Sequence, residues 1–197
     1  GSTPDAPDYA NLDFEAGVPV GIDGDRLEGV ELVQRLHKLG GRHGIGRTDH
    51  IENRLVGIKS REIYEAPAAT ILHTAHRELE KLTLAKDQVR FKRHVSEAYA
   101  DMVYNGQWFS VLHRELAAYL KVNQQHVTGT VRVRLHKASC TVVGRISPKS
   151  LYQMSLATYG KNDAYDHDAA VGFIKIHGLS QQTQARIQPA QSDETQA

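Results

Sequence analysis

The chain has 197 residues, enough for one domain of good size with its own hydrophobic core. Its 24 basic and 23 acidic side chains nearly cancel, so no excess charge attracts nucleic acid or an anionic membrane, and we expect neither as a partner. A single cysteine, Cys140, excludes an internal disulfide and fits a reducing compartment. No apolar run approaches the roughly 18 residues of a membrane-spanning helix and no signal peptide is visible, so we expect a cytoplasmic protein.

The two ends differ in composition from the rest of the chain. Residues 1–8 contain Pro4 and Pro7 and are typical of a linker, in which Gly1 and Ser2 resemble the remnant of a cleaved purification tag. Residues 189–197 have no large apolar side chain to order them, which predicts a disordered tail. Between them we expect one domain over residues 9–149 and a helical segment over residues 150–188.

Hydrophobic periodicity in the first third predicts a hairpin and then a helix. The hairpin is indicated by apolar residues at period two, with Asp23 and Gly24 as a turn; these residues are Leu12, Phe14, Val18, Val20 and Ile22. A helical stripe follows at Leu32, Leu36 and Leu39, and Gly40 with Gly41 is expected to end it.

The middle of the chain predicts helices and the following part a second hairpin. Pro67 suits the first turn of a helix, where its missing N–H costs nothing. Apolar faces at helical spacing then run through residues 71–82, 91–102 and 112–120, the second ending at Asn105 and Gly106. From Val127 to Leu135 the period drops to two, and residues 141–146 supply a partner strand.

This order of elements indicates an α+β fold. Strands lie towards both ends of the main domain around a helical middle, so we expect a mixed, largely antiparallel sheet with packed helices. Residues 150–160 and 166–188 are expected to be helical and to extend beyond the compact part.

Residues 44–67 form the most distinctive stretch, GIGRTDHIENRLVGIKSREIYEAP. It combines glycines and eight charged side chains with apolar residues such as Ile51 and Ile63. A solvated loop has no need of the apolar residues, and a core strand would not carry the charges. The pattern therefore predicts strands that pass charged groups into a cleft.

This stretch closely resembles one in the second half of the argininosuccinate synthases. The similarity continues in the family's order and spacing through residues 14–20 (FEAGVPV), 104–110 (YNGQWFS), 144–152 (GRISPKSLY), 156–159 (LATY) and 172–173 (GF). Members of the family open with a nucleotide-binding domain whose Ser-Gly-Gly-Leu-Asp-Thr-Ser loop holds the ATP pyrophosphate. No such loop occurs in this sequence, so the resemblance implies the C-terminal half alone.

The resemblance also implies an activity for the complete protein. An argininosuccinate synthase joins citrulline and aspartate in arginine biosynthesis and cleaves ATP, bound with Mg, to AMP and pyrophosphate. This half would contribute to the citrulline site and, through its C-terminal helix, to a homo-oligomer, a tetramer in the full enzyme. ATP and aspartate would bind in the other half, so the chain alone would hold no cofactor and be inactive. A catalytically silent oligomerisation or regulatory module of the same fold is the alternative.

Two residues match the family's citrulline ligands. Glu52 can accept hydrogen bonds from the ammonium of an amino acid, and Tyr64 can donate to an oxygen. Six neighbours in the same stretch can contact the substrate or, as we favour, form an ion-pair network that holds the two ligands in place. They are Arg47, Asn53, Arg54, Lys59, Ser60 and Arg61.

The remaining candidates favour ordinary structural roles. No side chain is a convincing nucleophile or base, and Cys140 lies in a strand pattern typical of a small buried hydrophobe. His73 and His76 lie three apart on a predicted helix, but without an HExxH or cysteine frame they predict no metal site. Trp108, with Tyr104 and Phe109, is expected to pack in the core around a helix end.

Overall fold

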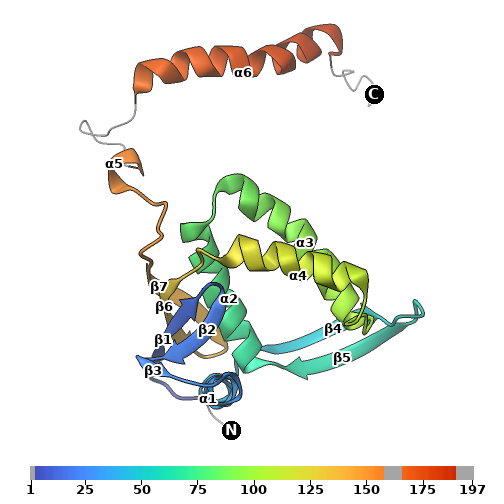
Figure 1. The fold of residues 1–197 in the computed structure, drawn as a ribbon, viewed down its shortest axis with the longest axis vertical. Coiled ribbons are helices and arrows are strands. Elements are labelled where there is room, and N and C mark those ends of the chain that lie inside the picture. The colour runs from blue at the N-terminus through green and yellow to red at the C-terminus, as the bar shows by residue number, and fades with distance from the viewer. Residues whose placement is uncertain (1–2, 158–165, 190–197) are drawn as a thin grey trace, which may run out of the picture. The chain divides into compact units, whose positions relative to one another are not determined.

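The computed structural model describes residues 3–157 and 166–189 (Figure 1). The chain divides into two compact units, Gly1–Tyr152 and Gln153–Ala197. The first unit holds two antiparallel sheets and four helices, and the second holds helices among its described residues. The α+β class predicted from the sequence is confirmed.

A five-stranded sheet in the order β3-β2-β1-β6-β7 forms the centre of the first unit (Figure 1). Its strands are β1 (Asp8–Glu15), β2 (Val18–Ile22), β3 (Asp25–Arg26), β6 (Gly129–His136) and β7 (Ser139–Ile146). Each pairing described between them is antiparallel. Both predicted hairpins are present, and β1 joins them by pairing with β6, so that Leu12 lies opposite Val131.

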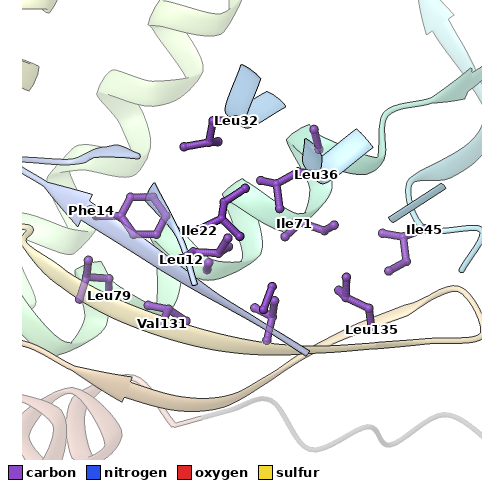
Figure 2. Close-up of a cluster of buried hydrophobic side chains, with 14 of the residues drawn as sticks. Leu12, Phe14, Ile22, Leu32, Leu36, Ile45, Ile71, Leu79, Val131 and Leu135 are labelled. Carbon is purple, nitrogen blue, oxygen red and sulfur yellow. The ribbon is translucent and has the colours of Figure 1, made fainter. Parts of the chain in front are cut away.

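The hydrophobic core lies between this sheet and two helices, α1 (Gly29–Arg42) and α2 (Pro67–Thr83) (Figure 2). Alternate residues of the strands point into it because side chains of a strand alternate between the two faces. Leu12 and Val131 from the sheet, Leu36 from α1 and Ile71 from α2 are fully buried there. Such burial stabilises the fold by roughly 1.5–3 kcal/mol for each large aliphatic side chain.

Helix α1 continues through the glycines that were expected to end it, and it ends at Arg42. A Cβ on Gly40 would lie 2.8 Å from Cδ1 of Ile71 and 2.9 Å from Cβ of Pro67. Gly40 is therefore a close-approach residue that lets α1 pack tightly against the start of α2. Pro67 is the first residue of α2, as predicted.

Asp8, which the sequence places in a linker, is the first residue of β1. Its Oδ2 lies 2.9 Å from Nε2 of the fully buried His43 and accepts a hydrogen bond of 3.0 Å from Arg42. These contacts fix the start of the sheet to the end of α1.

Two further helices, α3 (Lys86–Tyr104) and α4 (Val111–Gln124), follow α2. Gly106, at φ +68°, ends the first as predicted, and Ser110 caps the second by accepting a hydrogen bond from the backbone N–H of His113. The aromatic residues between the two helices do not pack in the core, contrary to expectation. Phe109 is 99% exposed and Trp108 48%, because the turn that carries them lies at the surface.

The second unit contains α5 (Met154–Ala157) and α6 (His167–Ile187). Helix α6 agrees with the prediction, and Asp166 caps it by accepting hydrogen bonds from the backbone N–H groups of Asp168 and Ala169. The helix predicted over residues 150–160 is wrong in part, because residues 150–153 are not helical. Residues 158–160 and 190–197 of the predicted helix and tail lie outside the described residues. None of the described helices is both long enough and apolar enough to cross a lipid bilayer.

Candidate functional site

The distinctive stretch folds as a hairpin of β4 (Arg47–Asn53) and β5 (Lys59–Glu65), which form a sheet of their own (Figure 1). Glu52 pairs with Ser60, and Thr48 pairs with Tyr64. Residues two apart in a strand share a face, so Glu52 and Tyr64 lie on the same face of the hairpin. The two residues that match the family's citrulline ligands are thereby brought together.

A hydrogen bond joins these two residues. The hydroxyl of Tyr64 donates to Oε2 of Glu52 over 3.2 Å, and the Glu52 side chain keeps only 18% of its surface exposed. Burial raises the pKa of Tyr64 above its usual value, and the hydrogen bond to Glu52 raises it further. The phenol therefore stays protonated, and remains a donor, throughout the neutral range.

His50 is the third member of this face, and sequence reasoning missed it. Its Nε2 lies 3.4 Å from Oε2 of Glu52, and its ring centroid is 5.3 Å from that of Tyr64. Its place two residues before Glu52 in a strand was the signal that could have found it. Both neighbours contact Oε2, whereas Oε1 of Glu52 has no hydrogen-bond partner within the part of the chain that the structure describes.

Ion pairs cross the hairpin between the other charged residues. Arg61 donates to both carboxylate oxygens of Asp49, at 2.8 and 2.5 Å, and lowers the pKa of that carboxyl. Arg47 donates to Glu65 over 2.6 Å. These two pairs lie on the face opposite Glu52, since their positions are odd-numbered in the same register.

Arg54 is the arginine on the Glu52 side of the hairpin. It donates to Oγ of Ser60 over 2.8 Å and to the carboxylate of Glu62. Arg54 therefore fastens β5 to the turn and leaves Glu52 unpaired by arginine. Four of the six neighbours singled out in the sequence make side-chain hydrogen bonds within the hairpin: Arg47, Arg54, Ser60 and Arg61. Asn53 accepts a hydrogen bond from Tyr104 at its carbonyl oxygen. Lys59 has no ion pair among the described residues.

The base of the hairpin is fixed by a close backbone contact. Gly46 has φ +77°, and a Cβ there would lie 2.6 Å from the carbonyl carbon and oxygen of Ala66. The carbonyl of Gly46 accepts a hydrogen bond of 2.9 Å from the Ala66 N–H. Only glycine allows this approach, so the start of β4 and Ala66, the residue before α2, lie against each other at the base of the hairpin.

Beyond the base, the hairpin is open to solvent. Its large apolar side chains, Ile51, Leu55, Val56, Ile58 and Ile63, are each at least 66% exposed. The sequence predicted a cleft here, and the described residues do not close one. Three arginines of the hairpin pair with carboxylates of the hairpin instead, and the apolar side chains stay exposed among the described residues.

Comparisons with known proteins show the family of this chain. The family described as "Arginosuccinate synthase C-terminal domain" matches residues 1–184. The chain belongs to the argininosuccinate synthase family. The argininosuccinate synthase of Dehalococcoides mccartyi is 53% identical over 193 residues, which are 98% of this chain and 48% of that protein.

Two other argininosuccinate synthases show the same relationship. That of Chlorobaculum tepidum is 54% identical over 180 residues, 91% of this chain and 45% of its own. That of Symbiobacterium thermophilum is 53% identical over 189 residues, 96% of this chain and 47% of its own. The chain spans about half the length of the curated relatives that it matches.

Among the described side chains of this argininosuccinate synthase domain, the Glu52 carboxylate offers a group for hydrogen bonding to a ligand. Burial raises the pKa of the Cys140 thiol to about 11, so it is not a nucleophile at neutral pH. Among the described residues, no three metal-binding side chains lie close enough to share an ion. The Glu52 carboxylate, with one oxygen held by neighbours and the other open, is suited to accept hydrogen bonds from a cationic group.

Proposed function

We propose that this chain is the C-terminal half of an argininosuccinate synthase and supplies part of its citrulline site. The whole protein would ligate citrulline and aspartate in arginine biosynthesis, with cleavage of ATP to AMP and pyrophosphate. The observation that carries the proposal is the pairing of Tyr64 with Glu52, which leaves Oε1 of Glu52 open on one face of the hairpin. Family membership supports the reaction class.

The two residues suit the amino-acid end of citrulline. The α-ammonium would donate to Oε1 of Glu52, and such charge-assisted hydrogen bonds are about twice as strong as neutral ones. Tyr64, which donates to Oε2, holds the carboxylate in the orientation that directs Oε1 outward. Its hydroxyl oxygen can also accept from the substrate.

In the complete protein the ureido oxygen of citrulline would attack the α-phosphorus of ATP, which binds with Mg, and displace pyrophosphate. The aspartate amine would then displace AMP from the citrullyl-AMP intermediate. This half contributes by positioning, since no described side chain here is a nucleophile for covalent catalysis. ATP and aspartate would bind in the part of the relatives that this chain does not span, so the isolated chain would release no pyrophosphate.

Assembly and location complete the proposal. The protein would act in the cytoplasm as a homo-oligomer, a tetramer in the full enzyme, with residues 150–188 as the multimerisation segment. Six large apolar side chains exposed on α6 support this role, since so many uncovered apolar side chains on one element mark an interface. They are Val171, Phe173, Ile174, Ile176, Leu179 and Ile187.

The test is Glu52→Gln in the protein that contains both halves. The change removes the charge and keeps most of the shape, so we expect citrulline to bind more weakly by about 1.5–3 kcal/mol, roughly ten- to a hundredfold. The constants for ATP and aspartate should hardly move. Titration calorimetry with citrulline, beside separate Michaelis constants for the three substrates, measures this.

Glu65→Gln is the matched control, because it removes the same charge from the opposite face of the same hairpin. It should leave the citrulline constant within about twofold. An unchanged citrulline constant in well-folded Glu52→Gln protein would remove Glu52 from the site. A protein with both halves and no ligase activity would instead favour the silent oligomerisation module.

A further inference from the structure

Tyr104 is the one residue from another element that forms a hydrogen bond with the body of the hairpin, residues 47–65, within the described part of the chain. Its hydroxyl donates to the backbone carbonyl oxygen of Asn53 over 3.2 Å (Figure 1 shows α3 reaching β4). Asn53 is the last residue of β4 and directly follows Glu52. The contact therefore lies at the far end of the hairpin, where Glu52 lies.

The hairpin needs such a contact because it is long and attached at one end. Glu52 is five residues beyond Arg47, or about 17 Å along an extended strand. A rotation of about 10° at the base would move Glu52 by about 3 Å over that length. Displacements of about 1 Å in a positioned group can reduce the rate about a hundredfold. A second attachment close to Glu52 would reduce such a movement.

Tyr104 lies close to a buried residue of α3. It is the last residue of α3, and Met102, two residues earlier, is 2% exposed. The turn that follows is closed by backbone hydrogen bonds from Gly106 to Val103 and from Gln107 to Met102, at 3.1 and 3.0 Å. The tyrosine is thus presented next to a hydrogen-bonded turn, although its own side chain is 54% exposed.

We propose that Tyr104 is a positioning residue for citrulline binding: its hydrogen bond to the Asn53 carbonyl ties the far end of the hairpin to α3 and sets where Glu52 lies. The inference rests on the proposed role of Glu52. It also gives a role to the Tyr-Asn-Gly sequence at residues 104–106. The tyrosine makes the tether, and Gly106 in the left-handed region ends the helix directly behind it.

The experiment is Tyr104→Phe in the protein that contains both halves, with Tyr9→Phe as the matched control. Tyr9 is also about half exposed, at 46%, and its hydroxyl makes no hydrogen bond within the described residues. Tyr104→Phe should weaken citrulline binding roughly three- to tenfold, the effect of losing one neutral hydrogen bond. The ATP and aspartate constants and the melting temperature should not change, and Tyr9→Phe should change none of these values.

Two further readouts separate positioning from general stability. Amide hydrogen exchange should become faster over residues 50–60 in Tyr104→Phe and remain unchanged in the core strand β6. In a Glu52→Gln background, Tyr104→Phe should add less than twofold to the citrulline constant, since it acts through Glu52.

The outcomes distinguish this inference from the proposed function. If Glu52→Gln lowers the affinity for citrulline and Tyr104→Phe does not, the positioning role of Tyr104 is wrong and the citrulline site stands. If Glu52→Gln has no effect, both are wrong. A Tyr104→Phe protein that melts earlier and loses affinity for all three substrates alike would show that the residue has only a structural role.

Discussion

Tyr64 reaches diagonally across the hairpin to Glu52, although the ladder pairs Tyr64 with Thr48 and Glu52 with Ser60. The long tyrosine side chain spans the one intervening pair on its face, His50 and Glu62, and its ring lies 5.3 Å from that of His50. A neutral donor thereby holds one oxygen of a carboxylate whose side chain is largely shielded from solvent.

Tyr64→Phe in the protein with both halves should weaken citrulline binding by a few fold. The effect should be smaller than that of Glu52→Gln, because only a neutral hydroxyl is lost. The pKa of Tyr64 is raised, so its hydroxyl stays protonated at pH 7 and at pH 9. The ratio of the variant's citrulline constant to that of the unmodified protein should therefore be the same at both values. A ratio that falls towards one by pH 9 would contradict the raised pKa.

Gly46→Ala should destabilise the fold strongly and Gly57→Ala only mildly. Both glycines have positive φ, +77° and +82°, so alanine costs about 1–2 kcal/mol of backbone strain at either position. At Gly46 the new Cβ also meets the Ala66 carbonyl at 2.6 Å, whereas Gly57 has nothing within 4 Å. We expect about 3 kcal/mol or more at Gly46, measured as the loss in free energy of unfolding by urea. Equal losses at the two positions would contradict the close contact at the base of the hairpin.

His76 should make stability depend on pH. Burial lowers its pKa below the ordinary value, against the opposing charge of Glu80, which lies 3.7 Å away and is itself paired with Lys92. The positive charge of Lys92 and the neighbouring His73 lower the pKa further. The unfolded chain therefore binds a proton at a higher pH than the folded one. Stability from this residue is complete above about pH 6.5 and is lost as the pH falls below that value.

His76→Gln tests this sign. Between pH 7.5 and 5.5 the unmodified protein should lose more free energy of unfolding than the variant, which lacks the titrating group. The exposed His37 of α1 supplies the matched control for loss of an imidazole, as His37→Gln. A variant whose stability falls as steeply as that of the unmodified protein would show that His76 does not titrate in this range.

Removal of residues 153–197 should lower the mass of the assembly. Helix α6 exposes its apolar side chains, among them Ile176 at 73% and Phe173 at 65%, and these are suited to bury against another copy. Tyr152 is the natural end point, because the N–H of Leu151 still donates to the carbonyl of Leu82 over 2.8 Å. Light scattering should show more than a monomer before the deletion and a smaller species after it. A monomer at high concentration before the deletion would contradict this use of α6.

The strands and helices were predictable where burial follows local periodicity. Leu12 and Phe14, like Val131 and Val133, alternate with polar neighbours because one face of their strand meets the core. The burial of Trp108 and Phe109 was predicted wrongly because these residues follow no such period. Apolar residues without a period carry no information about which side of the molecule they face.

Gly40 shows a related limit. Two successive glycines are a common helix stop, yet α1 continues because Gly40 meets Pro67 and Ile71 of another helix. The packing partner lies 27 or more positions further along the chain. A local pattern does not contain it.

The sequence by itself determined the family, the α+β class and the helical and strand periods, because each of these depends on residue type and short-range spacing. The resemblance to the family made Glu52 and Tyr64 candidate ligands. Only the tertiary structure decided that β1 joins the two distant hairpins, that Arg47, Arg54 and Arg61 pair away from Glu52, and that His50 and Tyr104 contact the site. The physical reason is that pairing across strands and contact between helices depend on which surfaces meet when the chain folds. Residues such as Tyr104 and Asn53, 51 positions apart, become neighbours through the path of the whole chain.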